Sequence, residues 1–442
     1  MDRRGFLVRT GLTFAAGALA TWQEAAGAEP SRGDLVAAER ALTRPAAGLS
    51  QGERLEEGWD AVRGLFSLSP EYLHFGGLYL ASHPAPVQQA IDTYRRGLDD
   101  NPVDYLHTEG PRLEAAVLRS AARYLGADPT DIALTDSTTM GLGLLYTGIE
   151  LRPDQEILTT QHDFYATHEA LRYAAARDGA SLRMVPLYRR IETVSADEIV
   201  DSVAQALGPR TRILAVTWVH SSTGLKLPIR RIADVLAEVN ADRAPAERVL
   251  LCVDGVHGLG VEDAQVASLG ADFFVSGAHK WLLGPRGTGF VWGRGQAAWA
   301  VARPTIPTFS DRRVPGGLMT PGGFHSFEHR WALSAAFDLH EQIGRSRVAA
   351  RIHGLNRQLK DGLASLRGVR LYTPLDEELS AGLVCFEVDG LSPESVVEQL
   401  HSRKIIATVT PYARAFARLA AGLVNTPEQV DSVVDAVRAI AT

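Results

Sequence analysis

The chain has 442 residues, of which 45% are hydrophobic and 22% charged, a composition typical of globular proteins. It carries 45 lysines and arginines against 52 aspartates and glutamates, which gives a formal net charge of −7 at pH 7. Because the sequence has no basic run, we do not expect nucleic acid as a partner. The length is sufficient for one large layered domain and a second, smaller one.

The first 28 residues have the pattern of an export signal. A charged start precedes an apolar middle, and residues 26–28 form a small-residue cleavage site. Arg3 and Arg4, followed by Gly-Phe-Leu, resemble a twin-arginine signal, which exports folded proteins. The apolar stretch is short for a membrane span, and no later segment reaches that length. We therefore expect transient contact with the Tat export machinery, a periplasmic or secreted protein, and no stable membrane anchor.

Short apolar runs alternate with helical patterns from residue 85 to about 300. Amphipathic segments such as 111–126 and 228–241 are predicted helices. The predicted strands are 131–136, 155–160, 211–219, 248–254, 271–276 and 289–293. This alternation predicts an α/β fold with a mainly parallel sheet flanked by helices, whose ligands bind at the carboxyl ends of the strands.

The pattern changes after about residue 330. A long helical run over 332–366 precedes predicted strands near 369–373 and 382–388 and a helix that begins at Ser392-Pro393. The last predicted helix opens with a capping box from Thr426 to Gln429. We expect a smaller α+β C-terminal domain. The predicted divisions are a signal peptide over 1–28, an N-terminal segment near the active site and small domain over 29–84, a large domain over 85–325 and the small domain over 326–442.

One lysine stands out in the segment SGAHKWLLGPRGTGF, residues 276–290. Lys280 follows a predicted buried strand, where a lysine is costly unless it pairs or takes part in chemistry. Asp254 ends the preceding predicted strand and is followed by Gly-Val-His-Gly. A lysine that holds an aldehyde as a Schiff base and an acid that pairs with a pyridinium nitrogen are what pyridoxal phosphate (PLP) demands.

A phosphate cradle and an aromatic face for the ring complete the requirements of PLP. Thr138 and Thr139 lie where the predicted strand 131–136 runs into a helix, whose free N–H groups and dipole favour a phosphate. His162 and Phe164 follow the predicted strand 155–160. The same residues also suit plainer roles, since threonines cap helices and Asp254 could form a turn before glycine.

With these motifs, the sequence resembles the class V aminotransferase superfamily of PLP enzymes, a fold-type I group that includes cysteine desulfurases, kynureninase and isopenicillin N epimerase. The segment DFFVSGAHKWLLGPRGTGFV resembles the lysine motif of the family, CVDGVHGLG its Asp-x-x-His element, and ARLAAGLVNTPEQVD its arginine-to-Asn-Thr signature. The resemblance covers nearly the whole chain after the signal. It implies a large PLP-binding domain, PLP as cofactor, a small amino-acid-like substrate and a homodimer.

Carried over by motif, the resemblance implies that Lys280 is the Schiff-base lysine and Asp254 the partner of the ring nitrogen, with His257 near the ring oxygen. The phosphate contacts it implies are Thr138, Thr139, Ser276 and His279.

For the ring and the substrate, the resemblance implies a stacking role for His162, with Phe164 as the alternative in relatives of shifted register. Arg418 would bind the substrate carboxylate, unless it forms a surface ion pair. Tyr79 and Arg330 are further candidate substrate contacts.

Two departures from the family pattern matter. Cysteine desulfurases carry a mobile cysteine upstream of the arginine that corresponds to Arg418, whereas this segment reads IIATVTPYARAFAR and argues against persulfide chemistry. The family's FE-x-GT, whose threonine reaches the phosphate of the partner subunit, is replaced by a sequence with Arg330 and Trp331. Cys252 and Cys385 lie in apolar runs, which favours buried thiols, although an oxidising compartment would permit a disulfide.

We expect an exported PLP-dependent enzyme that acts at Cα of an amino-acid-like or peptide-like substrate by transamination, epimerisation or elimination. Export suggests that it tailors a secreted natural product or siderophore. One alternative is a zinc metallopeptidase, because His325, Glu328 and His329 match an H-x-x-E-H pattern; the preferred interpretation involves no metal. The other alternative is a non-catalytic binding protein of the PLP fold.

Overall fold

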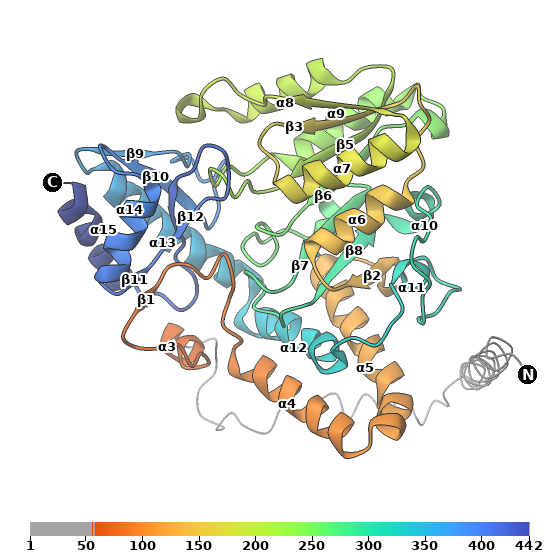
Figure 1. Cartoon of the computed structure of the whole chain (residues 1–442), viewed down its shortest axis with the longest axis horizontal. Helices are drawn as coiled ribbons and strands as arrows, with labels where there is room; N and C mark the ends of the chain where they lie inside the picture. Colours follow the sequence, from red (N-terminus) through yellow and green to blue (C-terminus); the bar gives the residue numbers. More distant parts are fainter. Residues whose placement is uncertain (1–54, 56–57, 442) are drawn as a thin grey trace, which may run out of the picture. The chain divides into compact units, whose positions relative to one another are not determined.

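The computed structural model describes residue 55 and residues 58–441 (Figure 1). The expected signal peptide, residues 1–28, lies outside the described residues. The same is true of the expected N-terminal segment before residue 58, apart from residue 55. Among the helices that the structure describes, none is long and apolar enough to cross a membrane.

A seven-stranded sheet is the centre of the larger part of the molecule, with the order β2-β8-β7-β6-β5-β3-β4. From β7 to β4 each neighbouring pair is parallel, whereas β8 is antiparallel to both β7 and β2. The strands are β2 (Ile132–Thr135), β3 (Glu156–Thr160), β4 (Ser181–Val185), β5 (Thr211–Thr217), β6 (Leu250–Asp254), β7 (Phe273–Gly277) and β8 (Gly289–Gly293). Six of these confirm predicted strands. The seventh, β4, is a half-buried edge strand without a continuous apolar run, so its sequence carries little signal.

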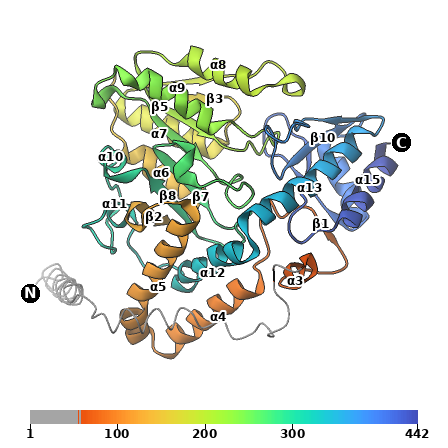
Figure 2. The ribbon, with the colours of Figure 1, turned by 180° about the vertical axis from the view of Figure 1, so that it is seen from behind.

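Helices cover both faces of this sheet (Figures 1 and 2). One apolar cluster packs α6 and α7 against one face, and a second packs α5, α9 and α12 against the other. The helices of this part are α4 (Ala85–Asp100), α5 (Pro102–Leu125), α6 (Thr138–Gly148), α7 (Tyr165–Asp178), α8 (Ala196–Ala206), α9 (Ile229–Ala241), α10 (Gly295–Trp299), α11 (Pro315–Met319) and α12 (Phe327–Ile343). We call the sheet with these helices the large lobe.

A four-stranded antiparallel sheet, with the order β12-β13-β10-β9, forms the centre of the small lobe. Its elements are β9 (Val369–Leu371), β10 (Val384–Val388), β12 (Thr408–Val409), β13 (Ala417–Leu419), α13 (Arg345–Ala364), α14 (Pro393–Ser402) and α15 (Pro427–Ala441). The N-terminal part contributes α3 (Trp59–Arg63) and β1 (Leu73–His74), which pairs in parallel with β11 (Ile405–Ile406). Figure 2 shows α13 running from the end of α12 to the small sheet.

Two helix boundaries illustrate how local sequence acts. The predicted helical run over 332–366 is divided into α12 and α13 at Gly344. Its φ is 93°, a backbone conformation that glycine adopts easily and that is strained for residues with a Cβ. The capping box of α15 is confirmed: the Gln429 N–H donates to Thr426 Oγ1 at 3.2 Å, and the Thr426 N–H donates to Gln429 Oε1 at 3.3 Å.

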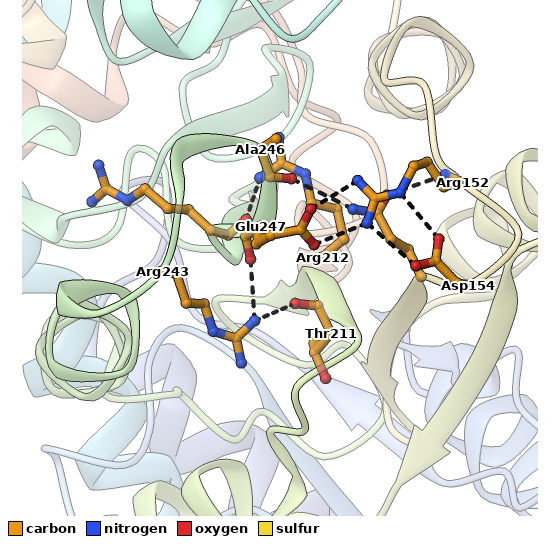
Figure 3. A network of polar contacts seen from close by, with 9 residues as sticks. Arg152, Asp154, Thr211, Arg212, Arg243, Ala246 and Glu247 are labelled. Atoms are coloured by element: carbon orange, nitrogen blue, oxygen red, sulfur yellow. Dashed lines mark hydrogen bonds and ion pairs between the residues drawn. The ribbon is translucent and has the colours of Figure 1, made fainter.

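A polar network holds the amino ends of the parallel strands (Figure 3). Arg243 Nη1 donates to the carbonyl oxygens of Thr211, at 2.8 Å, and Glu247, at 3.2 Å. Arg152 pairs with Asp154 at 3.1 Å and with Glu247 at 2.9 Å. Thr211 begins β5, so these contacts stabilise the edge of the sheet opposite to the carboxyl ends where ligands are expected.

Candidate active site

The predicted cofactor residues gather at the carboxyl ends of the central strands. Asp254 is the last residue of β6, and it pairs in register with Val275 of β7, five residues before Lys280. Thr138 is the first residue of α6, which follows β2. Because β6 and β7 are adjacent and parallel, the loops that follow them meet at one edge. The sheet therefore brings together residues from three separate motifs.

Lys280 lies against a neutral histidine. Its Nζ is 2.9 Å from His257 Nε2, and the indole N–H of Trp281 donates to His257 Nδ1 at 3.4 Å. Burial, with Lys280 and Arg418 acting in the same direction, lowers the pKa of His257 well below its ordinary value. A neutral imidazole has one N–H, so when Nδ1 accepts from Trp281, Nε2 donates to the amine lone pair. Burial lowers the pKa of Lys280 to about 8, which favours the nucleophilic amine.

Asp254 is a buried acid near this lysine. It is 3% exposed, and burial raises its pKa to about 6, against the opposing charge of Lys280. Its Oδ1 accepts the Val256 N–H at 3.0 Å, so the aspartate does make the turn contact considered above. A turn does not require burial, however, and the cost of burying a carboxyl indicates a further role.

A tight cradle lies between α6 and the end of β7. The Gly277 N–H donates to Thr138 Oγ1 at 2.7 Å, and a Cβ on Gly277 would come within 3.0 Å of the same oxygen. Ser276 is fully buried, with its hydroxyl donating to the Gly277 carbonyl at 3.0 Å. Burial lowers the pKa of His279 to about 4, helped by the charges of Lys280 and Arg286. Thr139 is exposed in the first turn of α6. Hydroxyl groups at a helix N-terminus suit a phosphate, so these residues fit PLP.

His162 and Phe164 both lie on the loop between β3 and α7. The His162 ring stacks on Tyr188, with ring centroids 4.4 Å apart and an interplanar angle of 11°. Phe164 faces Tyr412 edge to face, with centroids 6.0 Å apart. Burial lowers the pKa of His162, which favours the neutral ring. Which of the two stacks on the cofactor stays a prediction.

Arg418 is a buried cation in the small lobe. It is 3% exposed, and its Nε donates to Thr408 Oγ1 at 3.0 Å while Nη1 donates to the Ser221 carbonyl at 2.9 Å. Burial lowers its pKa. No carboxylate of the described residues forms an ion pair with it, so the surface-pair interpretation is wrong. A buried guanidinium without an acidic partner suits an anionic ligand.

The other two candidate substrate contacts differ in environment. Tyr79 is 67% exposed, and its hydroxyl is close enough to affect Arg418 electrostatically. Arg330 is 6% exposed and pairs with Asp136 at 3.4 Å, so its positive charge is partly balanced by this carboxylate. Their roles toward a substrate stay predictions.

Sequence reasoning missed the loop that follows β5. His220 is fully buried with neither ring nitrogen hydrogen-bonded, and burial lowers its pKa to about 4. Its ring centroid is 5.7 Å from that of His162. Ser221, the next residue, contacts both Arg418 and Tyr412. Asp254 was predicted as a site residue because it is a polar residue at the end of a buried strand. The same criterion, applied to the end of β5, would have pointed to this loop.

The zinc alternative is not favoured. Helix α12 begins at Phe327, so His325 precedes it and does not share a helix face with His329. His329 Nδ1 is 2.9 Å from the Arg286 carbonyl. Across residues 58–441, no group of three or more His, Cys, Asp or Glu side chains could hold a metal ion.

The two cysteines are free and buried, as expected. Burial raises the pKa of Cys385 to about 12 and that of Cys252 well above its ordinary value, so both thiols stay protonated and unreactive.

Comparison with known proteins identifies the family. Residues 81–433 match the family model Aminotransferase class-V. The chain therefore belongs to the class V aminotransferase family, whose members are PLP-dependent enzymes of fold type I.

The similar proteins include isopenicillin N epimerases and cysteine desulfurases. The chain is 28% identical over 402 residues to an isopenicillin N epimerase of Streptomyces clavuligerus, covering 86% of this chain and 98% of that protein. It is also 28% identical over 335 residues to a probable cysteine desulfurase of Pseudomonas aeruginosa, covering 70% of this chain and 77% of the relative.

Solved structures support the fold assignment. A variant of C-DES with glycine covalently linked to its PLP cofactor superimposes with a TM-score of 0.77 at 22% identity, covering 85% of this chain and 98% of the other. The apo cysteine desulfurase of Thermococcus onnurineus NA1 gives a TM-score of 0.74 at 20% identity, covering 86% and 98% of the two chains.

Proposed function

We propose that this chain is an exported PLP-dependent enzyme that acts at Cα of an amino-acid-like or peptide-like substrate. The observation that carries the proposal is the partly buried Lys280 just after β7, in contact with neutral His257 and near buried Asp254. PLP, when bound, supplies an electron sink for negative charge at Cα. In this proposal Asp254 holds the ring nitrogen, and the cradle around Thr138 holds the phosphate.

Lys280 is the proton-transfer base of this proposal. An amine with a pKa of about 8 can accept and return a proton near neutral pH, which is the requirement for general acid–base catalysis. Arg418 binds the substrate carboxylate through a charge-assisted pair and so orients Cα toward Lys280. The lobes meet around this point, and the homodimer implied by the family resemblance belongs to the same proposal.

Transamination, epimerisation and elimination all begin with loss of the Cα proton, and the proposal covers these three outcomes. Sulfur transfer is less well supported, because the segment from Ile405 to Arg418 contains no cysteine and both cysteines of the chain are buried elsewhere. Similarity to isopenicillin N epimerase over 86% of the chain supports chemistry on a peptide-like substrate. The signal-like first 28 residues support a secreted natural product or siderophore as the target of tailoring.

Cofactor loading tests the proposal. The purified protein incubated with PLP should gain visible absorbance, and Lys280→Ala should lose both that absorbance and turnover, because in this proposal Lys280 is the group that holds the aldehyde. Lys404→Ala, at an exposed lysine of the small lobe, is the control and should retain both. A wild-type protein that stays colourless after incubation with PLP would contradict the proposal.

A further inference from the structure

The loop between β5 and α9 connects the two lobes at the site. Ser221 of this loop accepts a hydrogen bond from Arg418 Nη1 at its carbonyl, at 2.9 Å. Its hydroxyl lies 2.7 Å from the hydroxyl of Tyr412. One residue of the large lobe therefore holds two side chains of the small lobe at once.

Tyr412 is directed toward this loop by its own turn. The segment 410–416 between β12 and β13 is closed by three hydrogen bonds. The Tyr412 N–H donates to the Thr410 carbonyl at 3.0 Å, the Phe416 N–H to Thr410 Oγ1 at 2.9 Å, and the Thr410 N–H to the Phe416 carbonyl at 3.0 Å. The Tyr412 ring reaches Phe164 of the large lobe, edge to face at 6.0 Å. These three hydrogen bonds fix the turn, which places the Tyr412 phenol between Phe164 and Ser221.

The chemistry of the phenol restricts its role. Burial raises the pKa of Tyr412 above its ordinary value, so the hydroxyl keeps its proton at neutral pH and does not act as a base. Its hydroxyl is near enough to Arg418 for each to shift the pKa of the other. A protonated phenol that is bonded to Ser221 next to a buried guanidinium is suited to fixing geometry.

The orientation of Arg418 depends on few contacts. Two of its nitrogens donate, one to Thr408 Oγ1 within the small lobe and one to the Ser221 carbonyl of the large lobe. The first contact holds the side chain within its own lobe, and the second aims it at the site. Ser221 must therefore be held in place, and Tyr412 is the side chain that bonds its hydroxyl.

We propose that Tyr412 is a positioning residue whose hydrogen bond to Ser221 aims Arg418 at the substrate carboxylate. This inference rests on the proposed function, in which Arg418 binds that carboxylate. It predicts that loss of the Tyr412 hydroxyl weakens recognition of a carboxylate and leaves the cofactor in place.

Titration of the PLP-loaded enzyme with glycine and with methylamine tests the inference. Both amines perturb the visible absorbance of the bound cofactor, but only glycine has a carboxylate. Tyr412→Phe should raise the apparent Kd for glycine about five- to tenfold, the loss of roughly one hydrogen bond, and leave that for methylamine unchanged. The spectrum before titration should match the wild type.

Two further variants sharpen this test. Ser221→Ala keeps the carbonyl that Arg418 uses and removes the hydroxyl, so it should reproduce the Tyr412→Phe effect, and the double variant should add nothing. Tyr173→Phe is the matched control, because this tyrosine is 58% exposed on α7, outside the 410–416 turn and the Ser221 loop, and should not influence glycine binding.

The outcomes separate this inference from the proposed function. If Arg418→Lys weakens glycine binding and Tyr412→Phe does not, the positioning role is wrong and the proposed function stands. Additive effects of the two single variants, or equal weakening of glycine and methylamine, would also overturn the positioning role. If Arg418→Lys leaves glycine binding unchanged, Arg418 does not bind the carboxylate, and the positioning role of Tyr412 is wrong as well.

Discussion

Lys280 lies in surroundings that oppose its charge. Burial disfavours the ammonium form, neutral His257 contacts Nζ at 2.9 Å, and only Asp254 among the causes of the pKa shift favours the charged form. The net effect moves the pKa from 10.5 to about 8. A shift of this kind prepares an amine for reaction with an aldehyde, because only the neutral amine is nucleophilic.

This shift makes the rate of PLP capture pH-dependent. Below the lowered pKa of about 8 the amine is protonated and unreactive, so capture should be slow at pH 6.5 and rise through pH 8 to a plateau. Mixing the apoprotein with PLP at a series of pH values and following the appearance of visible absorbance measures the rate. A midpoint near 10.5, the value of an ordinary lysine, would show that the site does not activate Lys280.

At the scale of elements, the junction of α12 and α13 determines how the small lobe continues from the large one. The run over 332–366 is helical on both sides of Gly344, and this one residue separates α12 from α13. Its φ of 93° and ψ of 117° lie where side chains with a Cβ are strained. The break therefore depends on the conformational freedom of glycine.

Replacement of two glycines near this junction should affect stability differently. Gly344→Ala should lower the free energy of unfolding by about 1–3 kcal/mol, the cost of holding a non-glycine residue in a sparsely populated region. Gly354→Ala, inside α13 where a Cβ meets nothing within 4 Å, should be neutral or stabilise by up to about 1 kcal/mol. Chemical denaturation measures both. Equal destabilisation by the two changes would show that the junction is not specifically strained.

At the scale of the whole molecule, the cofactor site bears on the proposed export signal. Asp254, Lys280 and the cradle come from separate loops that meet only in the folded large lobe. In the proposed export, a cofactor supplied in the cytosol is bound before translocation, so the protein travels folded. The twin-arginine route is the one that carries folded proteins, which is the physical reason for preferring it.

Replacing both Arg3 and Arg4 by lysine should retain the full-length precursor in the cytosol, whereas the wild type should be recovered outside it, cleaved after Ala28. Arg9→Lys, in the same segment but outside the arginine pair, is the control and should be exported normally. Cell fractionation followed by mass measurement of the mature chain gives the result. Normal export of the double variant would refute the twin-arginine route.

The order of apolar runs and turn residues was enough to predict most of the large lobe. Buried parallel strands require continuous apolar segments, and a charged residue at the end of such a segment is costly, so Asp254 and Lys280 were visible in the sequence. The edge strand β4 and the break at Gly344 were missed because a half-buried strand and a single glycine leave weak local signals.

Contacts between distant residues could not be predicted in this way. Ser221 meets Tyr412 across 191 positions of the chain and Arg418 across 197, and no local pattern couples such positions. The sequence by itself determined which side chains with suitable chemistry stand at strand ends. Only the tertiary structure decided that Arg418 is buried with no acidic partner among the described residues and that Ser221 meets both Arg418 and Tyr412, because burial and long-range hydrogen bonds arise from packing of the whole chain.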